Sequence, residues 1–298
     1  MAVAESAAHA VEAGASDPAR PPTIWRRLSR HRLFMTGAVI FGLMLFLAIF
    51  ADLLQLLPPE KMQVRLRFRT PDCPYPLGTD NYGRDIWSRL VHGARLSLAI
   101  GFAVALVTGI AGTVIGVAAG YFRRFDGPLM RLMDALMAFP AILLAIAIAA
   151  ALGPSAINAV IALSAVYTPR TARIVRSTVL VIREMDYVKA AQACGARDLW
   201  IVWRHVLPNS MAPLLVQLTF IFAYAILAES ILSFLGVGPP PPAPTWGSMI
   251  SEGKDYLREA PHICLFPGIA VALVCLGINL LGDGLRDVLD PRLRVQIG

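Results

Sequence analysis

The chain of 298 residues is 56% hydrophobic and only 16% charged, and it carries a net charge of +7. Soluble domains are about 45–50% apolar and about 25% charged, so the composition excludes an ordinary soluble domain and favours a membrane protein. The basic residues flank apolar runs instead of forming a separate domain, and this pattern speaks against a nucleic-acid partner.

The N-terminal residues 1–32 precede the first apolar run. Residues 1–22 are rich in Ala, Ser, Pro and Gly without periodicity, which predicts a disordered tail. The apolar run that follows is longer than the roughly 7–15 residues of a secretory h-region, so a signal peptide is not expected.

Six apolar runs approach the roughly 20 residues that a helix needs to cross the hydrocarbon layer. They lie at 33–57, 95–119, 130–152, 154–169, 212–236 and 262–282. The fourth is the shortest and is closed by Pro169 and Arg170, and Gly282-Asp283-Gly284 ends the sixth. The sequence therefore predicts an all-α, polytopic membrane protein with six transmembrane helices in residues 33–298.

The positions of Lys and Arg predict the orientation of the chain. With the N-terminus inside, the inner segments hold 18 basic residues and the outer segments hold 9. This bias predicts that both termini are cytoplasmic. The outer loop 58–94 is its weak point, because residues 61–95 alone carry seven basic residues.

A second long loop, residues 170–211, is expected on the cytoplasmic side. It predicts short helices over 170–184, 186–194 and 197–206. Gly195 suits the left-handed stop of one helix, and Pro208 is expected to end the next.

Small residues recur every four positions along the second predicted span. Gly112, Gly116 and Gly120 form one series, and Gly101, Ala105 and Gly109 form another. Such spacing lets helix backbones approach closely in lipid. Tight packing within the subunit is the favoured interpretation, and a seam that moves during function is compatible with it.

No set of residues suggests catalysis or metal binding. The five histidines do not have zinc-site spacing, and no GxxxxGK[ST] loop is present to bind a nucleotide. The four cysteines form no CxxC pair. Four free thiols are expected, with a Cys73–Cys264 bridge as the alternative.

Two acids fall at membrane depth, where ionisable groups are expensive. Asp134 lies near the inner end of the third span. Glu229 lies well inside the fifth, where it faces either a water-filled path or hydrogen-bonding partners near the outer interface. We expect a pathway lined partly by Met137, Pro140 and Glu229, with Pro140 as a kink.

Residues 187–209, YVKAAQACGARDLWIVWRHVLPN, resemble the EAA signature of ABC-importer permeases. That signature has Glu-Ala-Ala, then a glycine, then a Leu-Pro after a second short helix. Lys189 stands at the glutamate position, which is a departure from the pattern. The matching residues are Ala190, Ala191, Gly195, Leu207, Pro208 and Asn209.

Three further segments resemble the dipeptide, oligopeptide and nickel permease group. Residues 77–98 look like its outer-loop signature. Residues 229–247 and 279–294 look like the C-type member of its permease pair. The resemblance extends from about residue 23 to 294.

This resemblance implies a type I ABC importer permease of the bacterial inner membrane. It implies a homologous second permease, two cytoplasmic ATPase subunits that bind ATP and Mg, and an extracytoplasmic solute-binding protein. It implies a cytoplasmic tail 1–32 and a permease domain 33–298. It assigns ATPase coupling, within the loop 170–211, to Lys189, Ala190, Ala191, Gly195, Ala196, Arg197, Leu207 and Pro208.

Di- or oligopeptides are the expected solutes, and nickel or a glycoside is the alternative within the group. A polytopic membrane enzyme would need convergent catalytic side chains at one depth, and the sequence offers none. A channel would differ from an importer in needing neither ATP nor partner subunits.

Overall fold

The computed structural model describes residues 28–289, and the predicted tail therefore lies mostly outside the described residues. Within this range the chain is helical, apart from turns and two isolated β-bridges. The helices are α3 (Arg32–Ile49), α4 (Ala51–Leu54), α5 (Ile86–Tyr121), α6 (Arg123–Met137), α7 (Ala141–Leu152), α8 (Ala156–Arg183), α9 (Asp186–Ala193), α10 (Asp198–Ile201), α11 (Leu207–Phe234), α12 (Trp246–Gly253) and α13 (His262–Leu289). Short 3₁₀ turns cover Val64–Leu66 and Lys254–Tyr256, and a π-helical turn covers Val202–Val206.

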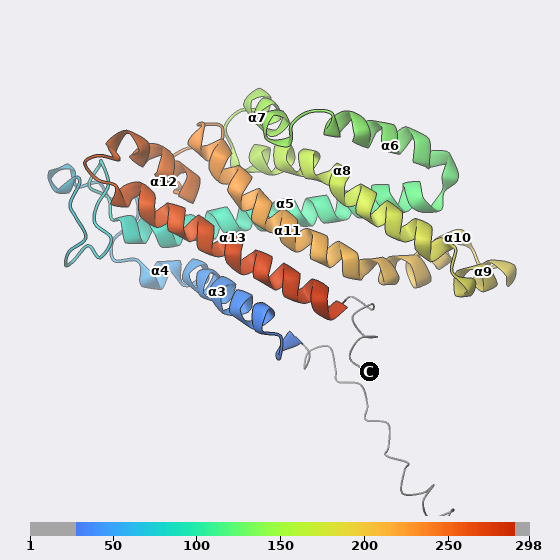
Figure 1. Ribbon diagram of the computed structural model, residues 1–298. Coiled ribbons are helices and arrows are strands. Elements are labelled where there is room, and N and C mark those ends of the chain that lie inside the picture. The colour runs from blue at the N-terminus through green and yellow to red at the C-terminus, as the bar shows by residue number, and fades with distance from the viewer. Residues whose placement is uncertain (1–27, 290–298) are drawn as a thin grey trace, which may run out of the picture.

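The long helices lie side by side, with the segment between α4 and α5 and helix α12 at one end and helices α9 and α10 at the other (Figure 1). The described chain ends meet, because His31 Nε2 lies 3.4 Å from the Asp287 carboxylate. Arg286 and Leu289 share a pocket with Asn209 at the start of α11. The start of α3 and the end of α13 therefore lie toward the α9 end.

The all-α prediction is confirmed, and the six apolar runs coincide with helices. The first run falls on α3 and α4, and the third falls on α6 and α7. Four helices are long and apolar enough to cross a membrane, and the bent pair α6–α7 makes a fifth candidate. Helix α8 occupies the place of the predicted fourth span. This helix is less apolar than the four candidates, because its second half carries four arginines.

The third predicted span, 130–152, is not one continuous helix, and the kink predicted at Pro140 is confirmed as a sharp break. Helices α6 and α7 meet at an angle of 91°. Pro140 precedes α7 with an extended ψ of 125°, and it lacks the N–H that a continuous helix would need. The proline also disfavours helical geometry in the residue before it, so the break falls at this point.

Two predicted helix ends in the inner loop are also wrong. Helix α8 runs through Pro169 to Arg183, so residues 170–184 extend a span and do not form a separate helix. Pro208 does not stop a helix, because it lies in the first turn of α11 directly after a π-helical turn, and helical structure continues through it. The π-helical turn joins α10 to α11 without a break.

The end predicted for the sixth span at Gly282-Asp283-Gly284 is wrong, since α13 continues to Leu289. These glycines are packing positions in a helix. A Cβ at Gly284 would lie 2.7 Å from Phe34 Cβ of α3, and one at Gly282 would lie 2.4 Å from Thr219 Oγ1 of α11.

The glycine series on α5 is a close-packed seam, as predicted. A Cβ at Gly116 would lie 2.7 Å from the carbonyl oxygen of Ala172, and one at Gly112 or Gly120 would meet side chains of α8 at 2.6 or 2.8 Å. Because α8 leads directly into α9, this seam fixes the helix that carries the inner loop against the long helix α5.

Candidate functional site

Helix α9 ends in a hydrogen-bonded stop built on Gly195. The Gly195 N–H donates to the Gln192 carbonyl at 2.9 Å, and the Ala196 N–H donates to the Ala191 carbonyl at 3.1 Å. This is the Schellman pattern, which needs a left-handed residue at the glycine position. Gly195 has φ +79°, so the left-handed stop predicted from the sequence is confirmed. No atom lies within 4 Å of a Cβ placed there, so the constraint is one of backbone conformation alone.

The predicted coupling residues divide between two faces of α9. Lys189 and Ala190 are exposed, as are Arg197 and Pro208 nearby. Ala191 and Ala196 are half-buried and pack against an apolar cluster that includes Val188 and Ile201. Any crowding at Ala191 therefore comes from its own chain, and Ala190 is the small residue presented outward.

Lys189 has a partner within the chain. Its ammonium lies 3.3 Å from the Glu184 carboxylate, and this contact holds the pKa of Glu184 below its ordinary value, mainly through the hydrogen bond. Both side chains are more than half exposed, so the pair adds little to stability. Because this ion pair is exposed and weak, Lys189 can also contact the surface of a partner subunit.

Apolar side chains surround this loop, and the sequence analysis did not single them out. Trp200 is 52% exposed, with its ring centroid 5.2 Å from that of His205. Leu199 and Trp203 line an apolar groove of about 530 Å³ against α5. Tryptophans three positions apart on a helix were the available signal. Exposed tryptophans are common at membrane interfaces and at protein–protein contacts, so this region is a candidate contact surface.

The structure does not bring the three predicted pathway residues together. Met137 and Pro140 are exposed at the break between α6 and α7. Glu229 is completely buried, and its carboxylate accepts hydrogen bonds from Ser233 Oγ at 2.7 Å and Ser97 Oγ at 3.3 Å. In this conformation Glu229 has the hydrogen-bonded environment that was the alternative interpretation.

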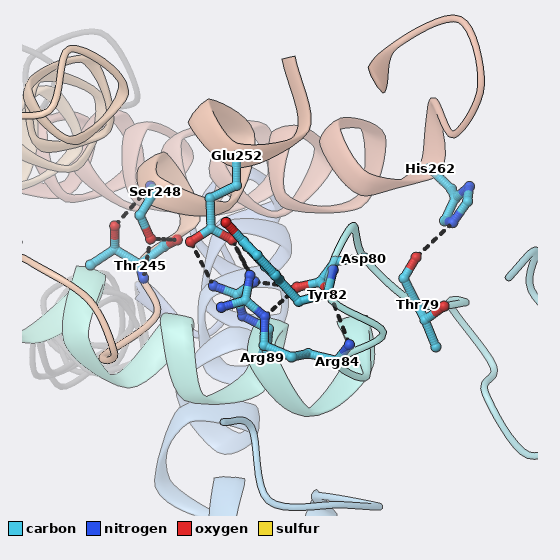
Figure 2. A network of polar contacts seen from close by, with 9 residues as sticks. All are labelled: Thr79, Asp80, Tyr82, Arg84, Arg89, Thr245, Ser248, Glu252 and His262. Carbon is cyan, nitrogen blue, oxygen red and sulfur yellow. Dashed lines mark hydrogen bonds and ion pairs between the residues drawn. The ribbon is translucent and has the colours of Figure 1, made fainter. Parts of the chain in front are cut away.

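At the opposite end, four charged side chains form a cluster that was also missed, in which three are buried and Glu252 is partly exposed (Figure 2). We call Asp80, Arg84, Arg89 and Glu252 the charged cap. Arg89 Nη1 lies 2.5 Å from Asp80 Oδ2 and 2.7 Å from Glu252 Oε2. Arg84 Nε lies 2.6 Å from Asp80 Oδ2, and Arg84 also pairs with Glu252. The cap therefore joins the outer loop and the start of α5 to α12.

The charged cap also explains part of the unusual charge of the outer loop. Two of its seven basic residues, Arg84 and Arg89, are neutralised inside the fold. A third, Arg95, pairs with Asp52 at 3.0 Å. Three of these basic residues therefore have acidic partners in the folded chain.

The four cysteines are free, as expected; Cys73 and Cys194 are exposed, and Cys275 is buried. Among residues 28–289, no group of His, Cys, Asp and Glu side chains is arranged to hold a metal ion.

Comparison with known proteins gives two family matches. Residues 112–295 match the binding-protein-dependent transport system inner membrane component family. Residues 23–71 match the N-terminal transmembrane domain of oligopeptide transport permease C.

Curated relatives match along most of the chain. A putative peptide transport system permease protein from Brucella abortus is 56% identical over 91% of this chain and 92% of its own length. The dipeptide transport system permease protein DppC of Alkalihalophilus pseudofirmus is 44% identical over 91% and 89%. The glutathione transport system permease protein GsiD of Pectobacterium atrosepticum is 39% identical over 91% and 90%.

Proposed function

The chain belongs to the family of inner-membrane components of binding-protein-dependent transport systems, as a C-type permease and not an enzyme, and from this we propose that it imports di- or oligopeptides. The names of its relatives support peptides over nickel or a glycoside, since those cited above are named for peptides, dipeptides and glutathione.

We infer that the chain forms half of a translocation pathway, together with a homologous second permease. Two cytoplasmic ATPase subunits would bind ATP and Mg, and an extracytoplasmic binding protein would deliver the solute. The break at Met137 and Pro140 would border the pathway. Glu229 would border it only after α12 has moved, because α12 and its flanking residues now cover that carboxylate.

The α9 loop carries the proposed coupling. It is held by α8 on one side and by the helix Asp198–Phe234 on the other, so displacement of α9 is transmitted to two long helices. Its exposed face presents Lys189 and Ala190, and Arg197 is exposed on the turn that follows. Leu207, which is half-buried, and Pro208, which is exposed, lie further along, at the start of α11. The inner side of the loop is held by Ala191 and Ala196, which pack against the apolar cluster, and by Gly195, which ends α9.

Reconstitution of the whole importer tests this function. We expect proteoliposomes that contain both permeases, both ATPases and the binding protein to accumulate a labelled dipeptide when ATP is present. A non-hydrolysable ATP analogue should abolish accumulation, and the isolated chain should hydrolyse no ATP. Peptide flux without ATP or without the ATPase subunits would identify a channel instead.

Two native cysteines at opposite ends test the proposed orientation, with both termini and the 170–211 loop cytoplasmic. Cys73 is exposed in the outer loop and Cys194 is exposed after α9. In intact cells that express variants in which Cys264 is also replaced by serine, a membrane-impermeant maleimide should label the Cys194→Ser variant, through Cys73, and should not label the Cys73→Ser variant. The opposite pattern would invert the topology. Permeabilised cells, in which both variants should react, provide the control.

A further inference from the structure

A pocket of about 560 Å³ opens between α8, α11 and α13, toward the α9 end of the molecule. Its apolar wall includes Ile174, Val216 and Phe220. Its polar lining comes from all three helices and consists of two arginines and two amides, namely Arg170, Arg286, Asn209 and Gln217. An apolar pocket with a few convergent polar groups is the usual form of a small-molecule site.

The two arginines have no ion-pair partner within the part of the chain that the structure describes. Neither Arg170 nor Arg286 has a carboxylate partner among residues 28–289, and the Arg170 guanidinium lies over the ring of Tyr224 at 6.0 Å. By contrast, the next two arginines of α8, Arg173 and Arg176, each pair with an aspartate of α6 at 2.6 and 2.5 Å. The pocket therefore retains positive charge that the fold neutralises elsewhere on the same helix.

Gln217 presents a second kind of polar group to the pocket. The residue is 6% exposed within its own chain, and it lines the pocket. Its carboxamide forms no hydrogen bond within the part of the chain that the structure describes, and it opens onto the pocket. The amide is therefore available to a ligand both as a donor and as an acceptor.

We propose that this pocket is a transient site for the carboxylate end of a peptide in transit, an inference that rests on the proposed peptide import. Guanidinium groups match a carboxylate in geometry and charge. The Gln217 carboxamide matches a peptide group, which offers one donor and one acceptor. The phosphate of a lipid headgroup would also satisfy the arginines, so the experiment includes an arm that separates a lipid from a peptide.

Photo-cross-linking tests the site on the assembled complex in nanodiscs of neutral phosphatidylcholine, without the binding protein. The probe is a tripeptide with a central photoreactive residue and a free C-terminus, competed by unlabelled peptide acid or peptide amide. We expect the wild-type complex to prefer the acid, and Arg170→Gln or Arg286→Gln to lower that preference about tenfold. Gln217→Met should weaken the binding of both peptide forms.

The conservative variant Arg170→Lys should retain part of the acid preference. Arg258→Gln, an exposed arginine outside the pocket, should retain all of it. Thermal unfolding of each complex establishes that the variants are folded. Unchanged acid preference in both arginine variants would overturn the site.

A second arm distinguishes a lipid from a peptide. If the arginine variants lose co-purified phosphatidylglycerol while peptide labelling is unchanged, the pocket binds lipid and the proposal is overturned. The proposed function is tested separately by the uptake assay. If the wild-type importer takes up peptide but the variants cross-link like wild type, the site is wrong and the proposed function stands. If the wild-type importer takes up no peptide, both the site and the proposed function are wrong.

Discussion

Replacing Arg89 with methionine is expected to lower the free energy of unfolding by about 3–5 kcal/mol. Arg89 is 3% exposed and bridges Asp80 and Glu252 in the charged cap. Its removal leaves two carboxylates facing one guanidinium, and Asp80 is almost completely cut off from water. A negative charge buried without compensation is strongly destabilising, whereas methionine keeps the aliphatic packing of the arginine stem. Thermal and denaturant unfolding of the purified protein measure the loss.

The matched control is Arg69→Met, in the same outer loop. Arg69 lies 3.9 Å from Asp72, and both side chains are well exposed, so its loss should change stability by about 0–1 kcal/mol. Asp80→Asn in the Arg89→Met background should destabilise less than the sum of the two single changes, because the pair shares one network. If Arg89→Met and Arg69→Met lower the free energy of unfolding equally, the charged cap contributes no more to stability than an exposed ion pair does.

The charged cap also shows why part of the fold was not predictable. Arg89 and Glu252 are 163 positions apart, and no local pattern pairs them. Counted in sequence, Arg84 and Arg89 are outer-loop charges relevant to orientation. Only the packing of α12 against the start of α5 turns them into a buried network.

The helices themselves were predictable, because apolar runs of sufficient length have few alternatives in lipid. Their ends were less so, since the effect of a proline depends on its position in the helix. Pro140 breaks a span, Pro169 lies inside one, and Pro208 follows a π-helical turn within a continuous helix. The sequence contains the same residue at all three places, and the tertiary context decides.

The candidate site was likewise predictable from the sequence only in part. The left-handed conformation of Gly195 followed from local sequence, because a glycine after an alanine-rich helix is a helix stop in most settings. The direction in which Ala191 faces did not, since it depends on where α9 packs against the end of α8. The unpartnered Gln217 needs three helices to define its surroundings.

Enlarging the outward face of α9 is expected to abolish transport without unfolding the chain. Ala190 is exposed, so tryptophan at this position can extend outward from the fold and fill the space into which an ATPase groove would close. Ala190→Trp should therefore reduce ATP-driven uptake at least tenfold, while the melting temperature and assembly into membranes stay normal. Ala190→Ser, which keeps the residue small, should transport like wild type. Ala191→Trp is the less informative change, because Ala191 packs against its own chain.

The backbone stop gives a second, independent test of the same loop. Gly195→Val forces a β-branched residue to φ +79°, which strains the Schellman stop by about 1–3 kcal/mol and reorients α9. Gly195→Asn is the matched control, since asparagine adopts the left-handed conformation with little penalty. We expect valine to leave ATP hydrolysis in the complex but to uncouple it from uptake, and asparagine to preserve both. Measuring uptake and hydrolysis together in proteoliposomes decides the matter: wild-type coupling in both Ala190→Trp and Gly195→Val would show that the α9 loop is only a solvated connection.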